Sequence, residues 1–224
     1  MISKLIDHTL LKVDTSQADI IQLCEEALQY GTYSVCVNPM WVSLAKMRLL
    51  DSQVKVCTVI GFPLSATYES VALVEAELAL MSGASELDVV LNVGALKSGD
   101  YYRVSTQLKT IVNAIRNVQM QDTVIKVIVE SAVLNEREKK LAAEIVVASG
   151  ADYLKTSTGF IPNPHLEDDV RFFKSVLPPD FKIKASGGIR DYQTARKLVD
   201  LGVERIGTSS TKQIIEQERV LGDS

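Results

Sequence analysis

Two lysines stand inside apolar, strand-like segments in the second half of the chain. Lys155 lies in Asp-Tyr-Leu-Lys-Thr-Ser-Thr-Gly, and Lys184 lies in Phe-Lys-Ile-Lys-Ala-Ser-Gly-Gly. They fall at similar points of consecutive segments, so we expect their ammonium groups to face each other. Like charges in a partly desolvated pocket disfavour each other, and one lysine then loses its proton near neutral pH. A neutral amine attacks an aldehyde or ketone to give an iminium, which predicts aldol cleavage or condensation.

Two acidic residues interrupt similar segments. Asp88 sits in Glu-Leu-Asp-Val-Val-Leu-Asn, and Glu130 ends Ile-Lys-Val-Ile-Val-Glu. For a single residue of this kind, a paired structural charge or a solvent-facing strand end is the better interpretation. The two lysines together are what favours chemistry.

Glycine- and hydroxyl-rich turns follow the last three strand-like segments, at residues 156–159, 186–189 and 207–210. Glycine lets backbone N–H groups approach an anion, and helix N-termini attract negative charge. Ordinary helix capping would explain one such turn. Three together predict a phosphate site, whose expected residues are Thr158, Gly159, Gly187, Gly188, Ser209 and Ser210.

The segments that carry these residues alternate in a regular pattern of short β-branched runs and longer helical spacings. Eight such pairs, with strands of nearly continuous apolar character, predict an α/β fold with a single (β/α)8 TIM barrel over residues 1–224. An open doubly wound sheet is the alternative. The predicted strands are Leu5–Leu10, Tyr33–Asn38, Val54–Ile60, Glu86–Leu91, Val124–Glu130, Asp152–Thr156, Phe181–Ser186 and Arg205–Thr208. The predicted helices are Gln17–Tyr30, Trp41–Leu50, Glu69–Ser82, Tyr101–Gln119, Glu136–Ser149, Leu166–Leu177, Asp191–Leu201 and Thr211–Arg219.

Composition narrows the class of protein. The 224 residues carry a formal net charge of -4 without a long basic cluster, so nucleic acid and anionic membranes are not expected partners. No apolar run approaches the roughly 20 residues of a membrane span, and we expect a cytoplasmic enzyme. The three cysteines form no paired framework. The two histidines lie in no ligand-like cluster, so neither a metal nor another cofactor is expected.

Seven motifs in the same order resemble the deoxyribose-phosphate aldolases, a family of class I aldolases. The resemblance covers nearly the whole chain. Its motifs are Ile-Asp-His-Thr-Leu-Leu-Lys (6–12), Val-Cys-Val-Asn-Pro (35–39), Val-Cys-Thr-Val-Ile-Gly-Phe-Pro-Leu (56–64), Glu-Leu-Asp-Val-Val-Leu-Asn-Val-Gly-Ala-Leu (86–96), Asp-Tyr-Leu-Lys-Thr-Ser-Thr-Gly-Phe (152–160), Lys-Ala-Ser-Gly-Gly-Ile-Arg (184–190) and Arg-Ile-Gly-Thr-Ser-Ser (205–210).

The resemblance implies a metal-independent barrel that cleaves 2-deoxy-D-ribose 5-phosphate to glyceraldehyde 3-phosphate and acetaldehyde. It implies that Lys155 forms the Schiff base, and that Asp88 and Lys184 transfer protons. A transaldolase-like lysine enzyme and a silent sugar-phosphate sensor remain the alternatives. The oligomeric state stays open, with a homodimer as one option.

Two departures from the family pattern concern the expected substrate site. Residues 161–166 read Ile-Pro-Asn-Pro-His-Leu in place of a glycine-rich turn, and Ser65 replaces a usual glycine. We expect the first departure to stiffen a loop near the phosphate.

Overall fold

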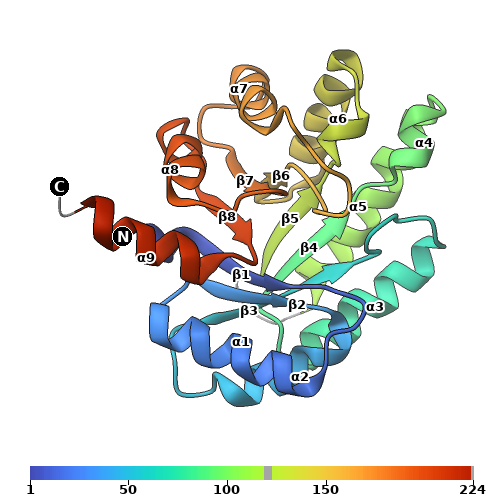
Figure 1. The fold of residues 1–224 in the computed structure, drawn as a ribbon. Helices are drawn as coiled ribbons and strands as arrows, with labels where there is room; N and C mark the ends of the chain where they lie inside the picture. Colours follow the sequence, from blue (N-terminus) through green and yellow to red (C-terminus); the bar gives the residue numbers. More distant parts are fainter. Residues whose placement is uncertain (119–122, 223–224) are drawn as a thin grey trace.

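Eight parallel strands form a closed barrel in the computed structural model, which describes residues 1–118 and 123–222 (Figure 1). Each strand pairs with its neighbours in sequence, and β1 pairs with β8 to close the sheet. The predicted barrel is confirmed, and the doubly wound alternative is wrong because an open sheet would leave β1 and β8 unpaired with each other. The strands are β1 (Ile6–Leu10), β2 (Ser34–Val37), β3 (Lys55–Ile60), β4 (Glu86–Val90), β5 (Val124–Ile128), β6 (Tyr153–Lys155), β7 (Lys182–Ser186) and β8 (Arg205–Thr208).

Helices surround the strands on the outside of the barrel (Figure 1). The sequence missed the short α4 and three 3₁₀ turns, η1 (Ile2–Leu5), η2 (Pro39–Trp41) and η3 (Ser131–Val133). Gln119, the predicted end of one helix, lies outside the described residues. The helices are α1 (Gln17–Tyr30), α2 (Val42–Arg48), α3 (Glu69–Met81), α4 (Val93–Lys97), α5 (Tyr101–Asn117), α6 (Glu136–Ser149), α7 (Leu166–Val176), α8 (Tyr192–Asp200) and α9 (Thr211–Gly222).

Local sequence fixes where several helices begin and end. Ser16 before α1 and Asn135 before α6 each form a capping box with an acidic residue three positions on. Gly31 and Gly150 end the same helices in the left-handed conformation, with φ of 63° and 82°. That conformation strains a side chain but not glycine, so the chain turns there toward the next strand.

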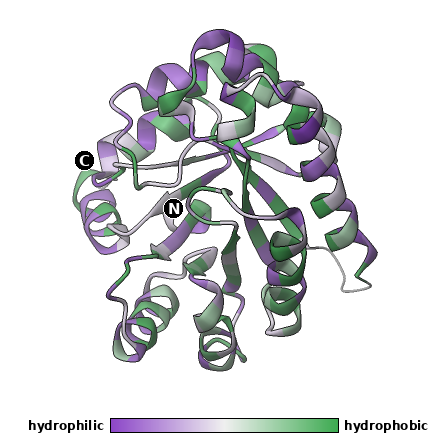
Figure 2. Ribbon diagram, turned by 90° about the vertical axis from the view of Figure 1, so that its right-hand side faces the viewer, coloured by the Kyte–Doolittle hydropathy of each residue, from purple (hydrophilic) through white to green (hydrophobic). Residues whose placement is uncertain are grey.

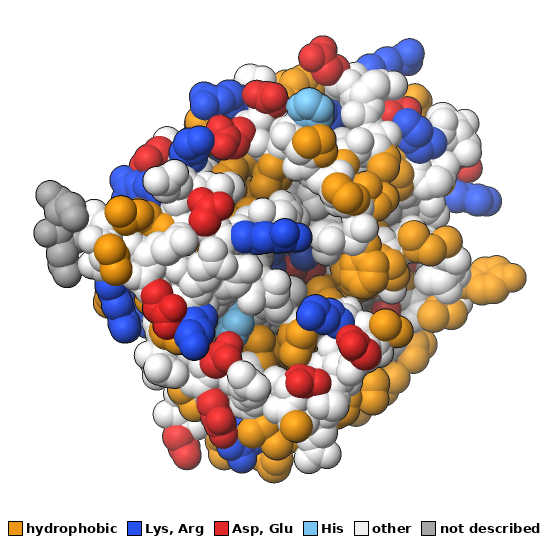
Figure 3. Space-filling model, in the orientation of Figure 1, with side chains coloured by type: hydrophobic (Ala, Val, Ile, Leu, Met, Phe, Trp, Pro, Cys, Tyr) orange, Lys and Arg blue, Asp and Glu red, His pale blue; other side chains and the backbone are white. Residues whose placement is uncertain are grey.

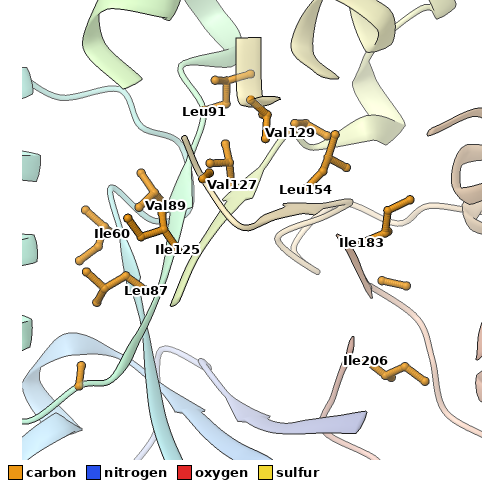
Figure 4. Packing of buried hydrophobic residues seen from close by; sticks show 14 of the residues in the cluster. Ile60, Leu87, Val89, Leu91, Ile125, Val127, Val129, Leu154, Ile183 and Ile206 are labelled. Carbon is orange, nitrogen blue, oxygen red and sulfur yellow. The ribbon is translucent and has the colours of Figure 1, made fainter. Parts of the chain in front are cut away.

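Alternation along the strands separates an apolar exterior layer from a polar interior. Figure 4 shows the labelled aliphatic side chains that pack outside the strands, among them Leu87, Ile125 and Ile183. Their neighbours in sequence, including Asp88, Lys126 and Lys184, are buried and bond to one another inside the barrel. Figure 2 shows the matching pattern on the helices, where hydrophobic and hydrophilic residues alternate along each coil.

Strand β6 ends at Lys155, one residue before its predicted end. The hydroxyl of Thr156 donates to the carbonyl of Ser186 at 3.2 Å and accepts the N–H of the same residue at 3.1 Å. These bonds turn the chain out of the barrel directly after the lysine.

Among the described residues, no helix is long and apolar enough to cross a membrane.

Candidate active site

Lys155 and Lys184 are directly opposite each other on neighbouring strands, since their Cα atoms are register partners between β6 and β7. The carboxylate of Asp88 lies between the two side chains. Its Oδ2 accepts from Lys155 Nζ at 2.9 Å and from Lys184 Nζ at 2.7 Å. The three residues expected to carry the chemistry therefore meet at a single oxygen atom.

The charges of Asp88 and Lys184 follow from their surroundings. Burial alone would lower the pKa of Lys184, but the nearby carboxylates of Asp7 and Asp88 outweigh it and raise that pKa above its ordinary value. Burial would likewise raise the pKa of Asp88, yet Lys126, Lys155 and Lys184 hold it well below its ordinary value. In the resting site at neutral pH, Lys184 is therefore a cation and Asp88 is an anion.

Lys126 on β5 is a third interior lysine that the sequence analysis missed. Its Nζ donates to Asp88 Oδ1 at 2.9 Å and pairs with Glu86 at 2.7 Å. A signal was present, because Lys126, Lys155 and Lys184 follow one another at equal intervals along the chain. The alternation of β5 also places Lys126 on the same face as the register partner Asp88 of β4.

A network of charges fills the barrel below the mouth. Arg205 Nη1 donates to Asp7 at 2.8 Å and to Glu86 at 2.9 Å, and its guanidinium lies 3.4 Å from the centre of the Tyr33 ring. Among the described residues of this network, the cations outnumber the carboxylates by one. The cations are Lys126, Lys155, Lys184 and Arg205, and the carboxylates are Asp7, Glu86 and Asp88.

Lys155 is the cation with the least compensation in this network. Within the described part of the chain, its ion pair is with Asp88 alone, and it shares that carboxylate with Lys126 and Lys184. Lys155 is also the network's one lysine among the residues that line the cavity at the barrel mouth. The surplus positive charge and access to a small molecule therefore coincide at Lys155.

A cavity of about 550 Å³ opens at the carboxyl ends of the strands. Figure 3 shows this face of the molecule, with a recess near its centre that basic side chains border. Five of the six residues predicted to bind phosphate line the cavity, and Ser210 does not. The five are Thr158, Gly159, Gly187, Gly188 and Ser209.

The glycines of these turns leave room for an anion. Gly159, Gly187 and Gly188 have φ of 89°, 95° and 76°, and a Cβ on Gly159 or Gly188 would meet no atom within 4 Å. The N–H of Ser210 instead donates to Thr208 Oγ1 at 2.9 Å. The Thr158 hydroxyl donates to the Glu130 carboxylate, which fixes the turn after β6.

Lys12 and Arg190 also line the cavity, and the sequence analysis assigned them no role. Lys12 follows β1, and Arg190 follows the glycine pair after β7. Both residues end motifs that carry the family resemblance, which was the available signal. Their cationic side chains add attraction for a phosphate to that of the backbone N–H groups.

The two departures from the family pattern have structural counterparts. Ser65 adopts a φ of 51° and is buried, so this turn demands the conformation that glycine tolerates best. In the loop before α7, the Asn163 amide donates to Ser131 at 3.1 Å and to Asp169 at 2.8 Å. These bonds support the expectation of a rigid loop.

The sequence is similar to those of known aldolases over nearly its whole length. A deoxyribose-phosphate aldolase of Geobacillus sp. is 46% identical over 215 residues, which cover 96% of this chain and 95% of the relative. One of Thermococcus gammatolerans is 47% identical over 220 residues, covering 97% and 96%.

Solved structures of aldolases superpose on this chain over nearly its whole length. An aldolase called QR15 superposes with a TM-score of 0.91 at 43% identity, with 98% of each chain covered. The deoxyribose phosphate aldolase from Aeropyrum pernix, described as a unique tetramer, gives a TM-score of 0.90 at 32% identity, covering 98% of this chain and 92% of that one. The family model of the DeoC/LacD aldolases matches residues 1–209, and the chain belongs to that family.

Proposed function

We propose that the protein cleaves 2-deoxy-D-ribose 5-phosphate to D-glyceraldehyde 3-phosphate and acetaldehyde through a Schiff base on Lys155, and catalyses the reverse condensation. The observation that carries the proposal is the position of Lys155 at the cavity floor, 2.9 Å from Asp88 and opposite Lys184. Relatives at 45% to 47% identity bear the name of this activity. Such an enzyme serves the breakdown of deoxyribose phosphate.

Lys155 supplies the nucleophile. Its neutral amine attacks the aldehyde carbon of the open-chain sugar, and loss of water gives an iminium that withdraws electrons from the adjacent carbons. Removal of the proton from the hydroxyl two carbons along then breaks the carbon–carbon bond and releases glyceraldehyde 3-phosphate. The remaining enamine takes up a proton and is hydrolysed to acetaldehyde.

Asp88 and Lys184 are the groups that move protons in this scheme. Asp88 Oδ2 already accepts from both lysines, so a proton can pass along this contact without a large movement of either side chain. Lys184 is protonated in the resting site, and its charge disfavours a second charge on Lys155. Lys184 therefore keeps the nucleophile available as well as supplying a donor.

The phosphate binds in the glycine turns at the other end of the cavity. Backbone N–H groups at Gly187 and Gly188 approach it, while Lys12 and Arg190 add charge-assisted hydrogen bonds. Binding energy at this remote group orients the sugar over Lys155.

The test is reduction with borohydride in the presence of acetaldehyde, followed by peptide mass mapping. One ethyl group should appear on Lys155, while Lys155→Met should show no labelling at the barrel mouth. Labelling spread over many surface lysines, or labelling of Lys184 in place of Lys155, would contradict the assignment. Product analysis with the 5-phosphate sugar then separates this activity from that of a transaldolase-like enzyme and from a silent sensor.

We also propose that the chain associates with a second copy through the outer face of α3. Four large apolar side chains lie exposed along that helix at helical spacing, namely Val71, Val74, Leu78 and Met81. The tetramer described for the Aeropyrum pernix relative supports self-association, and a homodimer is the smallest such assembly. Light scattering tests this face by comparing the molar mass in solution of Leu78→Glu with that of Leu28→Glu, which changes an exposed leucine on α1.

The three free, buried cysteines support a cytoplasmic location.

A further inference from the structure

Two cysteines stand beside the catalytic carboxylate. Cys36 on β2 and Cys57 on β3 are Cα partners in the sheet, and both are fully buried. Their two sulfur atoms and a carboxylate oxygen of Asp88 all lie within 4.8 Å of one another. Cys57 Sγ donates to Asp88 Oδ1 at 3.3 Å. Three atoms that can ligate a metal thus converge on one point of the barrel interior.

The spacing suits a soft divalent cation. Zinc binds thiolates at about 2.3 Å and carboxylate oxygens at about 2.0–2.2 Å, so the ligand atoms of a tetrahedral site lie roughly 3.4–3.8 Å apart. The present upper limit of 4.8 Å leaves only small side-chain movements to reach that geometry. Two thiolates, rather than oxygen ligands alone, select thiophilic cations such as zinc and cadmium.

The neighbouring charges can rearrange without leaving an ion unpaired. A cation at Asp88 Oδ1 would displace Lys126, which keeps its contact with Glu86 at 2.7 Å. Among the residues that the structure describes, Glu86 Oε1 is buried and has no hydrogen-bond partner, so the displaced ammonium has an acceptor available. Asp88 Oδ2 keeps Lys155 and Lys184.

Metal binding also leaves the net charge of the barrel interior unchanged. Binding of one divalent cation releases the two thiol protons of Cys36 and Cys57, so the barrel interior has the same net charge before and after.

The cavity at the barrel mouth adjoins the cluster that contains the two cysteines. Cys36 and Cys57 pack with Leu11 and Val59, and half-buried Phe62 lies against this group. Leu11 lines the cavity at the barrel mouth. Leu11 is therefore shared by the cavity wall and the cluster that holds the two cysteines.

We propose that Cys36, Cys57 and Asp88 form an inhibitory site for a thiophilic divalent cation, with zinc or cadmium as its occupant. The bound cation withdraws electron density from Asp88 through Oδ1, so Oδ2, which keeps its contacts with Lys155 and Lys184, becomes a weaker proton acceptor. Metal binding itself is independent of the reaction, whereas the inhibition rests on the proposed function.

The experiment is a titration of the reduced protein with cadmium, followed by ultraviolet sulfur-to-cadmium charge-transfer absorption. The absorption should saturate at one cadmium per chain. Cys36→Ala and Cys57→Ala should each weaken the affinity about 100-fold or more, since each removes one of three ligands. Cys24→Ala is the matched control, because Cys24 is equally buried but lies in α1, and it should bind as the wild type does.

Activity provides a second, separable readout. Cleavage should fall in step with the absorption and return on chelation, and Cys36→Ala should cleave normally and resist cadmium. Absorption that is absent from the wild type, or that persists in Cys36→Ala, would overturn the site. Absorption at one equivalent with full activity retained would overturn the inhibition alone, and a protein without aldolase activity would still give the absorption titration.

Discussion

Replacing Lys184 with methionine removes a positive charge beside Lys155 and keeps an apolar side chain of similar length. We expect imine formation with acetaldehyde to slow about 100-fold near neutral pH and to recover toward alkaline pH. The reason is electrostatic, because Lys155 would no longer share Asp88 with Lys184 and would hold its own proton more firmly.

The magnitude follows from the contacts. Lys155 Nζ and Lys184 Nζ lie 2.9 and 2.7 Å from the same oxygen of Asp88, so the two nitrogens are no more than about 5.6 Å apart. Two unit charges at that distance repel by about 3 kcal/mol at an effective dielectric constant of roughly 20. That energy corresponds to about a 100-fold change in the fraction of neutral amine.

The fold should tolerate the change, because the partners of Lys184 keep other cations. Asp7 retains Arg205 at 2.8 Å, and Asp88 retains Lys126 at 2.9 Å. Circular dichroism and thermal melting check this directly. Lys184→Arg is the matched control, since it keeps the charge and should keep the pH profile.

The assay is the rate of borohydride-trapped imine as a function of pH. The deficit of Lys184→Met should shrink about tenfold for each unit of rising pH in the range where the wild-type amine is already neutral and the amine of the variant is still protonated. A uniform loss at every pH, with an unchanged profile, would refute the electrostatic role and leave Lys184 as a proton donor only.

Three further predictions concern the turns and the charged interior. Ser65→Gly should raise the free energy of unfolding by about 1 kcal/mol, because it relieves a left-handed φ of 51°; a lower midpoint in urea would contradict this. Gly188→Asp should abolish the preference for the 5-phosphate sugar but leave imine formation with acetaldehyde intact, and a preserved preference would move the phosphate elsewhere. The pKa values of Asp7 and Asp88 lie below the ordinary 3.8, where nearby cations hold them against burial. Their contribution to stability is therefore present above pH 3.8 and lost as the pH falls below it, so Asp7→Asn should flatten the acid side of the stability curve.

The sequence predicted the strands and the proximity of Lys155 and Lys184 better than the charged network behind them. Period and turn residues locate β6 and β7 within one residue at most ends, and similar positions on consecutive strands were enough to pair Lys155 with Lys184. The position of Asp88 between the lysines depends on barrel closure, which brings β4 and β7 together across the interior. Pattern along one segment carries no information on such distant contacts.

Arg205 was missed for the same reason, whereas Lys126 was missed although its spacing from Lys155 and Lys184 was an available signal. A charged residue within an apolar strand is interpreted as a strand-end residue or as half of an ion pair as long as its partner in space is unknown. The short helix α4 escaped because five residues give too little periodicity to detect.

The interior network distinguishes Lys155 from the other buried cations. Buried charges are tolerated where opposite charges neutralise them, and three carboxylates neutralise three of the four cations. The remaining positive charge has no carboxylate of its own within the network. Arg205 retains its proton at any physiological pH. Lys126 and Lys184 are sealed below the mouth with at least two carboxylates each. Among the described residues of the network, Lys155 is the cation that lines the cavity and pairs with a single carboxylate, so a carbonyl compound bound there would meet this lysine first.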